Sequence, residues 1–166
     1  MELPNHTFYV DDIYAYIPLP YCKKIFYNDL DFYHYFIGRA DQSINFGTMC
    51  KRFDQQMRVF EIIFNGFTLK ELKTLPKPLY KYMFKWVMTI MAITTMTIIG
   101  TKEDKPMRKE EYKKFLRRLK ASEKKLYNKV RHRSLLSLVL NIPTYNIKSF
   151  LCRKVYTRYQ RKMKLG

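Results

Sequence analysis

The sequence predicts a mainly α-helical protein, and three observations support this. Glycine is scarce, with only 5 in 166 residues, which disfavours the many tight turns of a β-sandwich. Apolar residues recur at helical spacing over residues 55–65 and again over residues 107–130. Aromatic side chains make up 16% of the chain, enough to build a folded core.

The N-terminal part gives the weakest signals. Residues 8–17 alternate loosely between apolar and polar side chains, which is typical of a short strand and would make the fold α+β. Two prolines end that segment. Residues 29–37 are predicted to form a short helix, with Asp29 near its start and Gly38 as its stop.

Two further helices are signalled before residue 76. Residues 55–65 place apolar side chains on one helical face, and Gly66 follows as a stop. Thr68 is then predicted to cap a short helix that Pro76 ends.

Residues 79–99 are the most apolar part of the chain, and three structures compete for them. Pro78 at a first-turn position and Gly100 as a stop favour a buried helix. Abundant β-branched residues favour a long strand. A membrane-spanning helix needs about 18 apolar residues, whereas the uncharged run covers residues 86–99. If it did span a membrane, the basic residues after it would lie on the cytoplasmic side.

Positive charge is concentrated at the C-terminal end. The formal net charge is +18; residues 1–100 hold 11 Lys/Arg and 9 Asp/Glu, whereas residues 101–166 hold 21 and 5. We therefore divide the chain into a near-neutral, aromatic-rich compact domain (1–100) and a strongly basic helical region (101–166). Because such a segment repels itself, we expect it to have an anionic partner.

The clearest helix of the basic region starts near Pro106. Asp104 is placed to cap it, and apolar side chains from Tyr112 to Val130 follow one stripe. Lysines and arginines fill the opposite side, and only Glu123 interrupts the apolar stripe. The pattern predicts a single long amphipathic helix with one face packed and the other presenting a row of cations.

The end of the chain predicts a helical hairpin. With a first helix ending at Asn141, Thr144 would cap the second helix, and Ile147 and Phe150 would form its buried face. Over residues 107–160 this spacing resembles the three-helix layout of helix-turn-helix DNA-binding domains, without the usual glycine at the turn. The resemblance implies that the second helix enters a major groove. The alternative is an ordinary hairpin with a basic surface.

The candidate nucleic-acid-binding residues are the cations of the basic region and the side chains expected to be exposed on its last helix. Beyond Val155, basic and aromatic residues alternate, which predicts a frayed end suited to phosphate contacts and base stacking. The candidates are Lys113, Lys114, Arg117, Arg118, Lys120, Lys124, Lys125, Arg131, Arg133, Tyr145, Asn146, Lys148, Arg153, Lys154, Arg158 and Arg161.

No catalytic or metal-binding pattern stands out. Residues 9–12 are identical to the YxDD core of reverse transcriptases, whose paired aspartates hold Mg²⁺. Those enzymes need a third carboxylate on an earlier strand, which this sequence does not show, so we interpret Asp11 and Asp12 as a strand-end or capping pair. The three cysteines lie far apart and predict neither a disulfide framework nor a zinc site. We expect no enzyme activity, no cofactor and no metal.

The sequence therefore predicts a non-enzymatic protein that binds nucleic acid, either DNA or RNA. The start of the chain lacks a signal-peptide layout, which predicts an intracellular protein of the nucleus or the cytoplasm. One alternative is a membrane-associated or matrix-like structural protein, held on an anionic membrane surface by the basic helix or anchored by residues 79–99. Another is a module that binds an acidic protein surface. Self-association into a homo-oligomer is also open.

Overall fold

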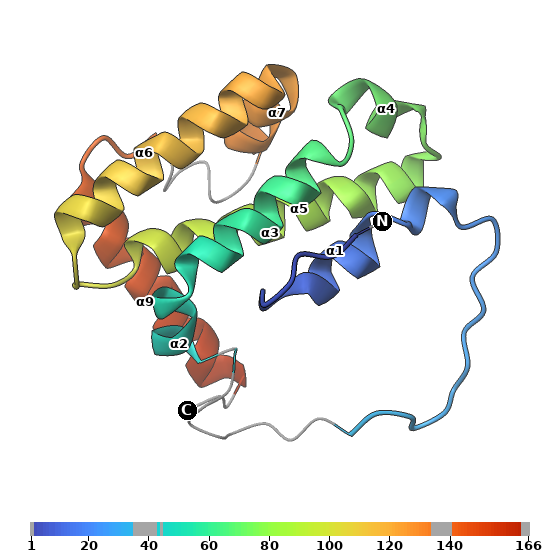
Figure 1. The fold of residues 1–166 in the computed structure, drawn as a ribbon, viewed down its shortest axis with the longest axis horizontal. Helices are drawn as coiled ribbons and strands as arrows, with labels where there is room; N and C mark the ends of the chain where they lie inside the picture. The colour runs from blue at the N-terminus through green and yellow to red at the C-terminus, as the bar shows by residue number, and fades with distance from the viewer. Residues whose placement is uncertain (1, 35–42, 44, 134–140, 164–166) are drawn as a thin grey trace.

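The computed structural model describes residues 2–34, 43, 45–133 and 141–163. These residues form helices and no strand, which confirms the prediction of a mainly α fold (Figure 1). The helices are α1 (Val10–Tyr16), α2 (Phe46–Lys51), α3 (Phe53–Asn65), α4 (Leu69–Thr74), α5 (Lys77–Ile99), α6 (Lys105–Ser122), α7 (Lys124–Arg133) and α9 (Tyr145–Met163), with a 3-10 turn η1 at Leu19–Tyr21.

Helix α5 is the central element of the fold. It crosses the molecule in Figure 1 and contacts α2, α3, α4, α6 and α9. The prediction of a buried helix is confirmed, with Pro78 in the first turn and Gly100 at the end, and the alternative of a long strand is wrong. Three threonine hydroxyls of α5, those of Thr89, Thr94 and Thr97, bond back to carbonyls of the same helix; Thr94 Oγ1 donates to the Ile90 carbonyl at 2.8 Å.

By length and composition α5 could also cross a membrane. More than half of its most apolar stretch is buried against other parts of the protein. The core helix of a globular protein passes the same test of length and hydropathy, so this property alone does not favour a membrane protein.

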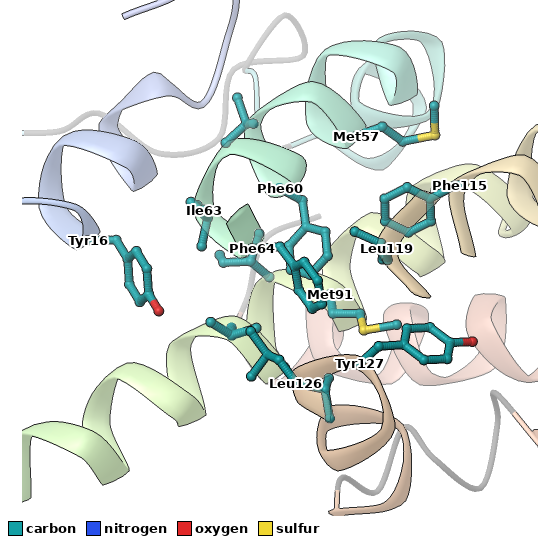
Figure 2. Packing of buried hydrophobic residues seen from close by; sticks show 14 of the residues in the cluster. Tyr16, Met57, Phe60, Ile63, Phe64, Met91, Phe115, Leu119, Leu126 and Tyr127 are labelled. Atoms are coloured by element: carbon teal, nitrogen blue, oxygen red, sulfur yellow. The ribbon is translucent and has the colours of Figure 1, made fainter. Parts of the chain in front are cut away.

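One hydrophobic core joins the two halves of the chain. Phe60 and Phe64 of α3 pack beside Met91 of α5 (Figure 2). Phe115 of α6 and Leu126 of α7 belong to the same cluster. The rings of Phe60 and Phe115 have centroids 5.8 Å apart. The basic region is therefore packed onto the near-neutral part through its apolar stripe.

The long helix predicted for the basic region is two helices. Glu123 separates α6 from α7, with a non-helical backbone at φ −144° and ψ 83°. Its carboxylate accepts hydrogen bonds from the main-chain N–H groups of Lys125 at 3.2 Å and Leu126 at 3.4 Å. The prediction of a single helix is wrong because the one residue that interrupted the apolar stripe supplies the acceptor that the new helix start needs.

Three other predictions at the helix level need correction. Residues 8–17 contain α1 instead of a strand; Ile13 and Tyr16 are buried three residues apart, which is a helical period, and the aspartates lie in the first turn. Residues 29–34 are not helical, and the rest of that predicted helix lies outside the described residues. The frayed end predicted beyond Val155 is instead a continuation of α9 to Met163.

Other predicted boundaries agree with the structure. Helix α3 covers the predicted segment 55–65 and ends at Gly66. Thr68 caps α4 in a reciprocal arrangement: its hydroxyl accepts from the Glu71 N–H, and the Glu71 carboxylate accepts from the Thr68 N–H at 2.7 Å. Asp104 occupies the N-cap position of α6, but its side chain makes no cap hydrogen bond.

A buried arginine holds three helix ends together. Arg108 of α6 is 5% exposed. Its Nη1 donates to the carbonyls of Thr97 at 3.2 Å and Ile98 at 3.3 Å, and its Nη2 donates to the Cys50 carbonyl at 2.8 Å. Thr97 and Ile98 lie in the last turn of α5, where carbonyls lack helical partners and a cation is favoured. The guanidinium also lies 4.4 Å from the centroid of the Phe53 ring.

We expect Arg108→Met to lower the free energy of unfolding by about 3 kcal/mol or more, because three buried carbonyls lose a charged donor. Urea denaturation of the full chain measures this. The matched control is Lys109→Met, which removes a positive charge from the exposed neighbouring position and should change stability by about 0.5 kcal/mol or less. Equal effects of the two substitutions would contradict a structural role for Arg108.

Candidate nucleic-acid interface

Helix α6 is fixed in rotation by the side chains it buries. Arg108, Tyr112, Phe115 and Leu119 are buried and share one side of the helix. Because an α-helix turns about 100° per residue, the remaining positions fall on two flanks and an outer face. The cations predicted as one row are thereby divided into two groups.

One flank and the outer face form what we call the basic ridge: Lys109, Lys113, Arg117 and Lys120. These side chains are exposed, and their spacing of four, four and three residues makes a continuous row roughly 17 Å long. Lys113 has an ion pair with Glu110 at 3.5 Å, in which both side chains are half exposed. Such a pair is weak in water, so the ridge remains available to an anionic partner.

The other flank of α6 is occupied by internal ion pairs. Lys114 lies 2.9 Å from a carboxylate oxygen of Glu111. Arg118 reaches across to α3, where its Nε and Nη2 donate to the same Glu61 oxygen at 2.8 and 2.7 Å. The structure thus places Lys114 and Arg118, both predicted binding residues, in contacts within the protein.

Helix α7 divides its cations in the same way. Lys124, Lys125 and Arg133 are exposed. Arg131 instead donates from Nε to the side-chain oxygen of Asn141 at 2.8 Å, which ties α7 to the chain that leads into α9. The exposed Lys124 at the start of α7 lies four residues after Lys120 in the sequence, beyond the break at Glu123.

Helix α9 is rotated relative to the prediction. Ile147 and Phe150, expected to be buried, are 50% and 55% exposed, whereas Ser149 and Cys152 are 1% and 2% exposed. The prediction failed because apolar side chains occur on both sides of this helix. The small side chains of Ser149 and Cys152 let the helix approach α5, so the larger apolar residues remain outside.

The face of α9 that was predicted to enter a DNA major groove is therefore largely packed against the rest of the protein. Tyr145, Lys148 and Arg153 are partly buried. The Lys148 ammonium lies 5.6 Å from the centroid of the Tyr112 ring, and burial lowers the pKa of Lys148. Arg153 donates to the Ser149 hydroxyl at 2.7 Å.

Three predicted residues of α9 remain exposed: Asn146, Lys154 and Arg158. The Arg161 side chain and residues 134–140, expected to form the first helix of the hairpin, lie outside the described residues.

Two residues that matter here were not among the predicted binding residues. Lys109 belongs to the ridge and lies four residues before Lys113, so helical spacing could have identified it. Lys105 and Lys109 also line a shallow hollow of about 450 Å³, where the first turns of α6 and α9 meet near Asn146. The positive ends of two helices add to the potential at this end of the ridge.

The chain matches no protein-family model, no curated protein and no solved structure. Among the described residues, no three His, Cys, Asp or Glu side chains come close enough together to hold a metal ion. The features of this protein that indicate a function are therefore its surface charges and their positions on the helices.

The orientation of α9 can be tested by thiol labelling. Burial raises the pKa of Cys152 to about 12 and that of Cys50 to about 11, and both side chains are buried. In a Cys22→Ser background the native protein should therefore react slowly, and Phe150→Cys in the same background should react on the order of a hundredfold faster. Fast labelling of the background protein, together with a slow thiol at position 150, would contradict the observed rotation of α9.

Proposed function

We propose that this protein binds the phosphate backbone of nucleic acid through the basic ridge of α6, without catalysis and without reading bases. The observation that carries the proposal is the segregation of cations on one helix. Lys114 and Arg118 contact acidic residues within the fold. Lys109, Arg117 and Lys120 are exposed and have no acidic partner in the part of the chain that the structure describes.

The dimensions of the ridge suit a phosphate backbone. Successive phosphates of one B-DNA strand rise about 3.4 Å along the axis but lie about 7 Å apart through space because the strand winds around that axis, so a straight ridge of roughly 17 Å runs beside about three of them. Lysine provides a compact charge on a flexible stem and acts as a point charge toward phosphate. Lys124 and Lys125 at the start of α7 can extend the contact. Four to six cations are thus available to displace counterions, which is the main source of affinity in non-specific binding.

The inner face of α6 argues against the membrane alternative. An amphipathic helix binds a bilayer by burying its apolar face in the interface. Tyr112, Phe115 and Leu119 of α6 are at most 4% exposed because they belong to the protein core. The ridge therefore offers a membrane only charge, whereas a phosphate backbone needs no apolar contact.

The central experiment compares two double variants of the same helix. Lys109→Gln with Arg117→Gln removes two ridge charges that have no acidic partner among the described residues, and Lys114→Gln with Arg118→Gln removes two charges from the paired flank. We expect the ridge variant to bind a 20-base-pair duplex about 10- to 100-fold more weakly at 0.1 M salt, because two phosphate contacts are lost. Fluorescence anisotropy of a labelled duplex measures the affinity.

The flank variant is the control, since both variants have the same net charge. It should lose less than about threefold in affinity, because both cations lie on the other flank of α6 and Arg118 donates twice to a carboxylate oxygen of Glu61. Equal losses in the two variants would show that net charge alone drives binding and would overturn the role of the ridge. Binding by an acidic protein or by phosphatidylserine vesicles, with no affinity for the duplex, would overturn the nucleic-acid proposal.

A further inference from the structure

An extended, aromatic segment projects from the helices. Residues 22–34 follow η1 and loop along the right-hand side of Figure 1, away from the helical body. Every described residue from 21 to 34 is exposed. Seven large apolar side chains of this segment are each at least 66% exposed: Tyr21, Ile25, Phe26, Tyr27, Leu30, Phe32 and Tyr33. An apolar surface of this kind in a soluble protein marks an interaction site.

The main chain of this segment makes few hydrogen bonds to the described residues, just as its side chains are mostly exposed. From Lys23 to Asp31, no main-chain N–H donates a hydrogen bond to any described residue. The nearest main-chain bond runs from the Phe32 N–H to the Leu30 carbonyl at 2.8 Å. Aromatic and β-branched residues favour strands. Residues 23–31 therefore resemble an edge strand, because their main-chain N–H groups donate to no described residue, and such a strand pairs readily with another chain.

The segment carries positive charges near one end and negative charges near the other, so two antiparallel copies can bring opposite charges together. Lys23 and Lys24 lie near one end, and Asp29 and Asp31 lie near the other. In an antiparallel pair related by a two-fold axis through Tyr27, Lys23 faces Asp31 of the second copy and Tyr27 faces its equivalent. Opposite charges and aromatic pairs across strands are stabilising. A parallel, in-register pair would place like charges beside each other.

We propose that residues 22–32 pair antiparallel with the same residues of a second copy of this chain and so form a two-fold dimer. A two-fold interface is self-complementary by definition, and the pair of Lys23 with Asp31 of the second copy, formed twice, meets that condition; Lys24 faces Leu30 and Asp29 faces Ile25. Insertion into a membrane is disfavoured, because unpaired main-chain groups are costly in hydrocarbon. Pairing with a second copy satisfies the main-chain groups along one edge of the segment and leaves the other edge to water.

The local contacts of the aspartates do not prevent this pairing. Asp29 accepts a hydrogen bond from the Tyr27 hydroxyl at 3.3 Å. Asp31 lies 3.5 Å from His34, in a pair whose side chains are 81% and 80% exposed. Contacts this exposed are weak. An intermolecular lysine can therefore replace them.

A charge-swap experiment on the full chain tests the dimer. One variant carries Lys23→Asp with Lys24→Asp, and the other carries Asp29→Lys with Asp31→Lys. Sedimentation velocity from about 1 to 100 µM should show a wild-type dimer that dissociates on dilution, because a two-stranded ribbon alone is marginally stable. Each variant alone should be monomeric over that range, and an equimolar mixture should regain the dimer, since opposite charges then face each other again.

The matched control is Lys70→Asp with Lys73→Asp on α4, where both lysines are exposed and outside the segment. It should dimerise like the wild type. Circular dichroism verifies that all variants keep the helical fold. A monomeric wild type at 100 µM, dimers in either single variant, or a mixture that stays monomeric would each overturn the proposal. Vesicle binding by a chain that stays monomeric would assign the segment to a membrane instead.

Discussion

The burial of the inner face of α6 against the core fixes where every charge of that helix points. Phe115 packs on Phe60 of α3, and Arg108 binds the last carbonyls of α5. With these contacts in place, α6 has one rotation only. Its basic residues then fall either toward α3, where Glu61 binds Arg118, or toward solvent along the basic ridge. The proposed binding surface is thus a consequence of core packing.

The same contacts explain why α6 can carry so much charge without unfolding the protein. Arg108 is cationic but lies among carbonyls and the Phe53 ring, which replace the water it loses. Arg118 and Lys114 are compensated by carboxylates. Lys109, Arg117 and Lys120 of the ridge have no carboxylate partner among the described residues, so their mutual repulsion is left uncompensated. A partner that supplies negative charge along this line relieves that repulsion.

Local patterns in the sequence predicted much of the fold but little of the distribution of charge. Periodicity and capping signals identify α3, the Thr68 cap and the end of α5 at Gly100, because each of these depends on neighbouring residues. The break at Glu123 was visible as a flaw in the apolar stripe and was interpreted as a tolerated exception. The role of Arg118 depends on Glu61, which is 57 residues away in sequence, so no local pattern could separate it from the ridge.

For helix α9, too, the sequence alone could not predict which face is buried. Its sequence offers two apolar sides, and only the close approach to α5 selects the one with Ser149 and Cys152. Tyr145, Lys148 and Arg153, which were predicted to face a DNA groove, are consequently partly buried. A dimer formed through residues 22–32 would carry two ridges, and linked sites bind a long polyanion with a higher effective concentration than a single site.

The salt dependence of binding by the wild-type protein distinguishes phosphate contacts through the basic ridge from other modes of binding. Each displaced phosphate counterion contributes about 0.9 to the slope of log affinity against log salt concentration. Four to six contacts therefore predict a slope of about −4 to −5 for a protein monomer, with the same value for two duplexes of unrelated sequence. A slope near zero, or an affinity that depends strongly on base sequence, would contradict binding through the basic ridge.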